Sequence, residues 1–119
     1  MSGPQSSFFD VLQQDPHVVC MKSEQLTEDE NLEELDQDFI RLVDNQGVKN
    51  LVVDLGSVRY MTSAAIGKLI ALHRRLGRLE GKLILANLQV AVHDILDTAH
   101  LLTYFTVTDT VDDGVASLS

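Results

Sequence analysis

The sequence has a single cysteine and no long apolar run. Cys20 cannot form an internal disulfide, which is consistent with a reducing compartment. No apolar run approaches the roughly 20 residues that a transmembrane helix needs. Residues 1–7 lack the basic and apolar regions of a secretory signal. We therefore expect a cytoplasmic protein that does not insert into a membrane.

Positive charge is also scarce in this chain. Nine lysines and arginines stand against 18 aspartates and glutamates, so the formal net charge is −9. Phosphate backbones and anionic membranes repel such a chain, so nucleic acid is not expected as a partner. The charge is uneven, because residues 24–44 are acidic and residues 68–78 are basic. This asymmetry predicts two faces with different roles.

The motifs of enzymes and metal sites are missing as well. There is no glycine-rich phosphate loop, nucleophile elbow or paired-carboxylate site, so we expect neither an enzyme nor a cofactor. The four histidines do not have the spacing of a helical His-x-x-x-His or of a Cys/His cluster, and no metal site is predicted. These histidines are His17, His73, His93 and His100.

The chain does have enough apolar residues for the hydrophobic core of one domain, since 45% of its 119 residues are apolar. We expect a disordered end at residues 1–7 and a single domain at residues 8–119. Hydrophobic periodicity and turn residues predict the element order β-β-α-β-α-β-α-β-α. The predicted strands are residues 8–12, 17–22, 51–55, 82–86 and 104–107. The predicted helices follow Thr27, open at Thr62 or Ser63, and cover residues 90–96 and 110–118, with Thr110 as the cap of the last helix. Residues 23–28 and 56–61 are expected to be loops.

The strand and helix units are joined by short loops, which implies a largely parallel sheet with right-handed crossovers. The N-terminal hairpin adds antiparallel pairing. The predicted fold class is therefore α/β, with a mixed sheet of about five strands and helices mainly on one face. The continuously apolar strand 51–55 should be central, between strands 82–86 and 17–22. Thr27 and Glu30 have the spacing of a capping box at the start of the first helix.

Functional residues of open α/β sheets gather where the carboxyl ends of strands meet helix N-termini. In this sequence that place is residues 54–67, where a buried strand ends, a loop turns and a small hydroxyl residue opens a helix. Ala64, Ala65 and Gly67 are small, so the backbone there can be approached closely. The side chain of Thr62 or Ser63 is expected to cap the helix.

This segment resembles the signature of the STAS family, in which a strand ending in Asp leads through a small-residue turn to Asp-Ser-Ser/Ala-Gly/Ala at a helix start. The likeness in element order covers residues 17–118, and the likeness in motif is confined to residues 51–67. The resemblance implies an anti-sigma-factor antagonist that binds a kinase-type anti-sigma factor. Phosphorylation of one serine by that kinase would abolish the binding, and a serine phosphatase would restore it.

Carried over to this sequence, the resemblance places the phosphorylated position at Ser63, with Thr62 as the lesser candidate, and the strand-end acid at Asp54. Thr62 stands where the family often has an acid. The residues expected to contact the partner are Asp54, Ser57, Arg59, Thr62, Ser63, Ala64, Gly67, Lys68, Arg75 and Arg78.

Two interpretations of the basic helix remain open. Lys68, Arg75 and Arg78 lie near one helical face, because seven residues are almost two turns. This face could steer association with an acidic groove, or it could consist of solvated cations near the favourable C-terminal end of the helix.

The class of function is open as well. The resemblance also allows a non-catalytic STAS subunit of a lipid-transporting ABC complex or of a stress-sensing assembly. Such a subunit should expose a larger apolar patch, whereas a switch should present a polar surface with a hydroxyl that can be modified.

Overall fold

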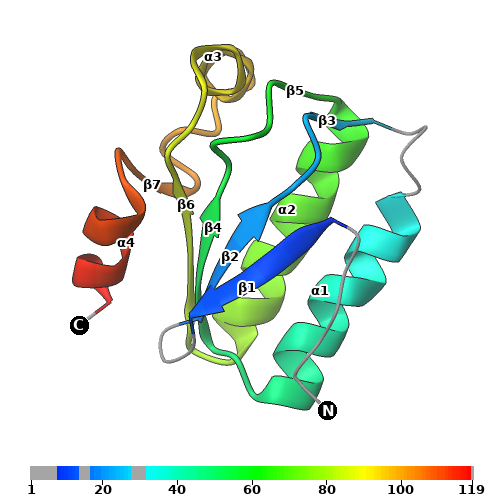
Figure 1. Cartoon of the computed structure of the whole chain (residues 1–119), viewed down its shortest axis with the longest axis vertical. Coiled ribbons are helices and arrows are strands. Elements are labelled where there is room, and N and C mark those ends of the chain that lie inside the picture. The colour runs from blue at the N-terminus through cyan, green and yellow to red at the C-terminus, as the bar shows by residue number, and fades with distance from the viewer. Residues whose placement is uncertain (1–7, 14–16, 28–31, 119) are drawn as a thin grey trace.

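The computed structural model describes residues 8–13, 17–27 and 32–118, and its main sheet has the strand order β1-β2-β4-β6-β7 (Figure 1). The first pair is antiparallel and the other three pairs are parallel. This confirms the predicted mixed sheet, with β4 between β2 and β6. The strands are β1 (Phe9–Gln13), β2 (His17–Met21), β4 (Asn50–Asp54), β6 (Lys82–Ala86) and β7 (Thr106–Thr108).

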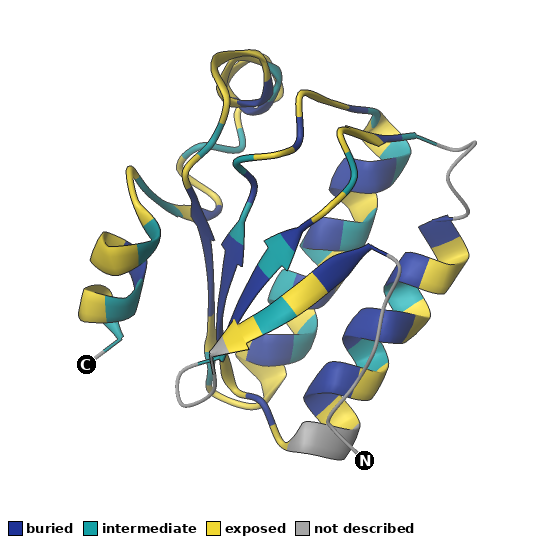
Figure 2. Ribbon diagram, in the orientation of Figure 1, coloured by how far each residue is buried: buried dark blue, intermediate teal, exposed yellow. Residues whose placement is uncertain are grey.

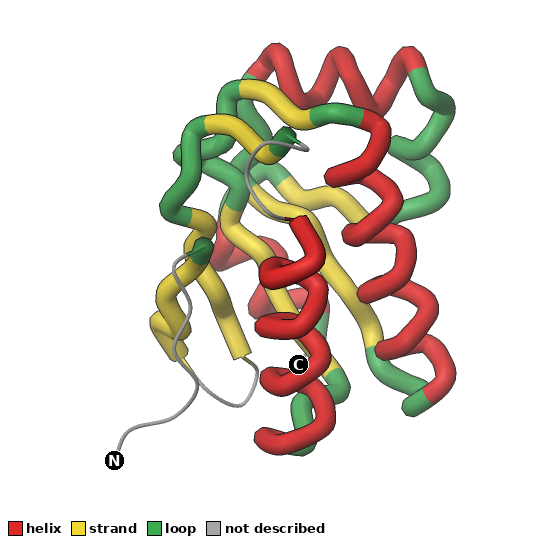
Figure 3. Tube along the Cα trace, turned by 90° about the vertical axis from the view of Figure 1, so that its right-hand side faces the viewer, coloured by secondary structure: helices red, strands yellow, loops and turns green. Residues whose placement is uncertain are grey.

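Helices cover both faces of this sheet, although unequally. The helices α1 and α2 lie side by side on one face, α3 crosses the carboxyl end of the strands, and α4 lies on the opposite face (Figures 1 and 3). The position of α4 is the exception to the expectation of helices mainly on one face. The bounds are α1 (Leu32–Gln46), α2 (Ser63–Arg78), α3 (Val90–Thr98) and α4 (Val111–Ser117).

Two hydrophobic cores follow from the alternation of side chains along the central strands. Figure 2 shows that most residues of β4 and β6 are buried. The larger core lies under α1, α2 and α3, where Phe9 of β1 stacks on Phe39 of α1 with ring centroids 5.0 Å apart. The smaller core lies under α4, which approaches closely because Gly114 has no side chain to meet Val52 and Ile84. The continuous apolar character of β4 therefore reflects burial on both faces.

Two short strands were not predicted, because residues 23–28 and 56–61 were interpreted as loops. β3 (Gln25–Leu26) and β5 (Tyr60–Met61) pair in parallel as a separate small sheet. The N–H of Arg59 donates to the carbonyl of Glu24 at 2.7 Å, and the N–H of Thr62 donates to the carbonyl of Leu26 at 3.0 Å. This sheet fixes the segment that leads into α2.

The start of α4 agrees with the sequence-based prediction, because its capping residue could be recognised in the sequence. The side chain of Thr110 accepts a hydrogen bond from the N–H of Asp113 at 3.0 Å, which confirms the predicted cap of the last helix. The expected disordered end, residues 1–7, lies outside the described residues, as does Glu30 of the expected capping box. Within the described residues, every helix is too short or too polar to cross a bilayer.

Candidate functional site

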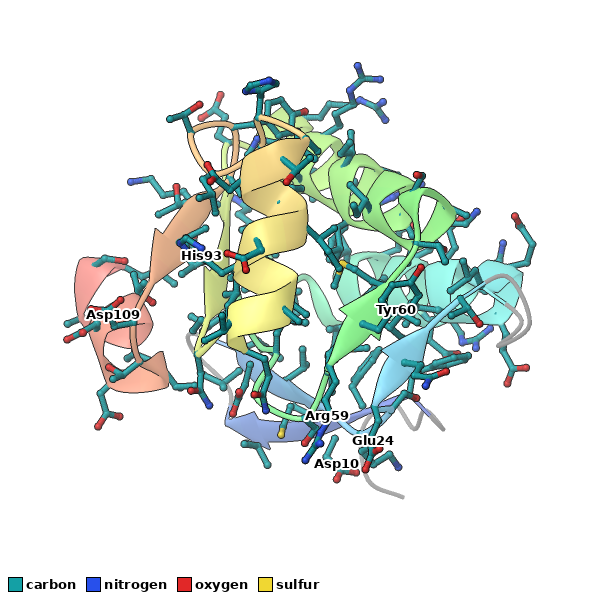
Figure 4. The ribbon with its side chains drawn as sticks, turned by 90° about the horizontal axis from the view of Figure 1, so that it is seen from above. Asp10, Glu24, Arg59, Tyr60, His93 and Asp109 are labelled. Atoms are coloured by element: carbon teal, nitrogen blue, oxygen red, sulfur yellow. The ribbon has the colours of Figure 1, made fainter. Side chains whose placement is uncertain are left out.

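The candidate site is the loop between β4 and α2, residues 55–62, together with the first turn of α2. Figure 4 looks onto this end of the sheet, with Arg59 and Tyr60 on the segment that enters α2 and α3 beside it. Glu24 lies next to Arg59, in agreement with the backbone hydrogen bond between these two residues. The β-strand ends, the small β3–β5 sheet and the N-terminus of α2 therefore meet at one surface.

Asp54 connects the two loops that emerge at this end of the sheet. Its Oδ1 accepts hydrogen bonds from the N–H of Gly56 at 2.8 Å and from Nδ2 of Asn87 at 3.2 Å. Gln89 Nε2 donates to the carbonyl of Gly56 at 2.5 Å. In the structure this carboxylate therefore binds groups of two loops, and its contact with a partner stays a prediction. Asp54 thus acts as a positioning residue that braces the β4–α2 loop against the β6–α3 loop.

Cys20 lies beside Asp54 in the register of β2 and β4, and opposite Asp10 of β1. Burial raises the pKa of the Cys20 thiol, and the negative charge of Asp54 and a hydrogen bond to that carboxylate raise it further. A raised pKa disfavours the thiolate, which is the nucleophilic form of cysteine. The environment of Cys20 therefore opposes a role as a reactive thiol.

The two adjacent hydroxyl residues have different environments. Ser63 is the first residue of α2 and is exposed. Thr62 occupies the N-cap position with an extended backbone, φ −96° and ψ 171°, but its side chain makes no capping hydrogen bond. Its Oγ1 is buried and has no hydrogen-bond partner among the described residues. The expectation of a side-chain cap from Thr62 or Ser63 is therefore wrong, although Thr62 does stand at the cap position.

The surface around Ser63 has polar and apolar components. Ser57 and Arg59 are exposed, Ala64 is half-buried, and the space around Gly67 is open. Two apolar side chains here were not predicted as site residues. Tyr60 on β5 is 50% exposed and Val90 at the start of α3 is 77% exposed, and α3 lies against β5. Their apolar character suggests core positions, so only the fold could show that they face solvent.

The basic residues of α2 divide into two groups. Lys68 Nζ donates to Glu33 Oε2 at 2.7 Å, and Arg75 Nη1 lies 3.6 Å from Asp44 Oδ2. The hydrogen bond to Glu33 raises the pKa of Lys68. Both pairs connect α2 to α1, so Lys68 and Arg75 face the neighbouring helix. Arg78 is exposed.

The residues predicted to contact a partner therefore form two surfaces. Those of residues 54–67 gather at the carboxyl end of the sheet. Arg75 and Arg78 belong to the last turn of α2, about 20 Å from Ser63 at a rise of 1.5 Å per residue. A partner must be wide enough to span α2 in order to contact both.

The hydrogen bonds that Asp54 accepts should contribute to the stability of the fold. Replacing Asp54 with alanine should lower the free energy of unfolding by about 1–3 kcal/mol, because two donors lose a charged acceptor. Urea denaturation followed by circular dichroism measures the change. Asp109→Ala is the matched control, since Asp109 is exposed and a surface substitution should cost less than about 0.5 kcal/mol. Equal midpoints for the two variants would contradict this role.

Comparison with known proteins identifies the family. The STAS domain family model matches residues 10–114. BtrV of Bordetella bronchiseptica, which is named among the anti-sigma factor antagonists, is 24% identical over 100 residues, or 84% of each chain. An anti-sigma factor antagonist from Mycobacterium paratuberculosis has a TM-score of 0.80 at 23% identity, covering 99% of this chain and 98% of that one. The phosphorylated form of the Bacillus cell fate determinant SpoIIAA has a TM-score of 0.68 at 14% identity, covering 93% and 97%. Because the family model spans most of its length, the chain belongs to the STAS domain family.

Proposed function

We propose that this chain is an anti-sigma factor antagonist that binds a kinase-type anti-sigma factor in the cytoplasm and is released when that kinase phosphorylates Ser63. A serine phosphatase would then restore binding. Membership of the STAS family and the name of BtrV support the general class. The observation that carries the switch is the exposed hydroxyl of Ser63 at the first position of α2.

The start of α2 suits a phosphate. The N–H groups of the first helical turn have no acceptor inside the helix, and the helix dipole favours an anion there. In α2 the helical hydrogen bonds begin at Ile66, whose N–H donates to the carbonyl of Thr62 at 3.0 Å. A phosphate on Ser63 would add about −1.5 to −2 charge. The domain could hold this charge without refolding, while a partner docked on the same surface would be repelled.

Ser63 is a better phosphate acceptor than Thr62. A kinase must reach the hydroxyl that it modifies, and Oγ1 of Thr62 is buried. SpoIIAA of Bacillus, a structural neighbour of this chain, is known in a phosphorylated form, which supports a phosphate-dependent switch here. Thr62 replaces the acid that the family often has before the serine, and its buried hydroxyl is out of reach of a kinase.

Mass spectrometry of the protein isolated from its native host tests the acceptor. We expect phosphate on Ser63 and an unmodified Thr62, because Ser63 is exposed whereas Oγ1 of Thr62 is buried. Fragment ions that break the chain between these two residues distinguish the sites. The Ser63→Ala variant expressed in the same host is the control and should carry no phosphate in this peptide. Phosphate on Thr62 alone, or an unmodified peptide in every growth phase, would contradict the switch.

The alternative is a non-catalytic STAS subunit of a larger assembly, such as a lipid-transporting ABC complex or a stress-sensing complex. A subunit of this kind should expose one continuous apolar patch. In the described part of the chain, the large exposed apolar side chains are spread over β1, β5, the end of α2, α3 and the α3–β7 loop, which favours the switch. They are Leu12, Tyr60, Leu79, Val90 and Tyr104.

A further inference from the structure

The start of α3 is hydrogen-bonded to the loop that leads from β4 to α2. Gln89 is the N-cap residue of α3, and its Nε2 donates to the carbonyl of Gly56 at 2.5 Å. Two residues earlier, Asn87 Nδ2 donates to Asp54 Oδ1 at 3.2 Å, and the N–H of Gly56 donates to the same oxygen at 2.8 Å. The start of α3 is therefore held against the β4–α2 loop, and the two form one continuous surface.

Two large apolar side chains are exposed on this surface. Val90 follows Gln89 directly and is 77% exposed, and Tyr60 on β5 is 50% exposed. Figure 4 shows β5, with Tyr60 labelled, beside α3 and leading into α2. Valine is a weak helix former, and Val90 buries little apolar area within the domain. The fold itself therefore gains little from Val90, whereas a partner docked here would bury it.

Charged residues are scarce on the segments that form this surface. The chain has 27 charged residues, 9 basic and 18 acidic, but residues 55–63 and 87–92 together contain only Arg59. The first turns of α2 and α3, both fully described, contain no acidic residue, whereas α1 and α4 each have two acids in that turn. Because the helix dipole favours an acid there, local helix stability does not explain this difference. The carboxyl end of the sheet thus presents a nearly uncharged surface in a strongly acidic chain.

We propose that the start of α3 is part of the surface that binds the anti-sigma factor, with Val90 and Tyr60 at its apolar centre and Ser63 at its edge. This inference rests on the proposed function, which also limits the charge of the partner. A basic docking face would be attracted by a phosphate on Ser63, and release would not follow. A strongly acidic face would be repelled by a net charge of −9 even before phosphorylation. The occupant is therefore an uncharged, apolar face of the anti-sigma factor.

Surface plasmon resonance with the purified anti-sigma factor and variants of Val90 tests this proposal. Val90→Asp and Val90→Lys should each lose at least about tenfold in affinity, because either charge would be desolvated in an apolar contact. A loss with both signs of charge distinguishes an apolar contact from an electrostatic one. The matched controls Leu12→Asp and Leu12→Lys make the same changes at an exposed apolar residue of β1, outside this surface. These controls should bind like the parent chain.

Thermal melts should show that all four variants are folded, because both positions are exposed. If the parent chain binds and both Val90 variants bind equally well, the role of α3 is refuted while the proposed function stands. If the parent chain does not bind, the proposed function fails and this inference fails with it. A loss in only one Val90 variant, or equal losses at Leu12, would also overturn the apolar contact. Self-association of the parent that disappears in Val90→Asp would show that a second copy covers this surface instead.

Discussion

Replacing Ser63 with aspartate should weaken binding to the proposed kinase-type anti-sigma factor by about 100-fold, equivalent to ~2.7 kcal/mol. Ser63 is exposed at the first position of α2, so a partner docked on the β4–α2 loop must cover it. A partner that fits the neutral serine would desolvate a carboxylate there, and desolvating an unmatched charge costs several kcal/mol. Titration of the partner by calorimetry or surface plasmon resonance measures the loss.

The same substitution should leave the fold intact. Surface changes usually alter the free energy of unfolding by less than about 0.5 kcal/mol, and an acid in the first turn of a helix is favoured by the dipole. Ser63→Ala should bind like the parent and resist inactivation by the kinase. Thr103→Asp, which adds the same charge at an exposed residue outside the candidate site, is the matched control. If Ser63→Asp binds as tightly as the parent, the switch is refuted and the structural-subunit alternative takes its place.

The second large effect is expected at Gly81, where alanine should lower the free energy of unfolding by about 3 kcal/mol. A Cβ at this position would collide with the carbonyl oxygen of Lys49 and would lie 2.5 Å from its carbonyl carbon. These are backbone atoms, and the same carbonyl accepts the N–H of Lys82 at 3.0 Å where β4 and β6 begin to pair. The clash can be relieved only by shifting one of the two central strands.

Gly77→Ala provides the control for this prediction. Gly77 lies inside α2, and a Cβ there would meet no atom within 4 Å. Alanine in a helix is more favourable than glycine, so this variant should gain about 0.5–1 kcal/mol. Urea denaturation should therefore move the two midpoints in opposite directions. Equal midpoints would show that β4 and β6 adjust to a side chain at Gly81.

Local patterns in the sequence were sufficient for the order of the main elements. The continuous apolar run of β4 indicates a strand buried on both faces, and a strand of this kind belongs in the centre of a sheet. Thr110 followed by an acidic first turn predicts the start of α4, because the hydroxyl, the orphan N–H groups and the dipole all act within one turn. Strand patterns and helix caps depend only on residues that are close neighbours along the chain.

Contacts between distant segments could not be inferred in the same way. β3 and β5 have two residues each, too few for any periodicity, and they exist because Glu24 and Leu26 lie beside the entry to α2. Asp54 has the position of a partner-binding acid in the sequence, but Asn87, 33 residues away, donates to it in the fold. Such pairings arise from the packing of the sheet and its loops.

Local sequence patterns and contacts between distant segments also contribute differently to the hydroxyl and basic residues of the site. The sequence by itself determined that a small hydroxyl residue opens a helix behind a buried strand, because strand and helix periodicities change there. Only the tertiary structure decided that Ser63 is exposed while Oγ1 of Thr62 is buried. The tertiary structure also pairs Lys68 and Arg75 with acidic residues of α1, whereas Arg74 and Arg78 are exposed to solvent. The physical reason is that periodicity assigns a residue to a face of its own helix, whereas the elements packed against that face decide whether it is covered.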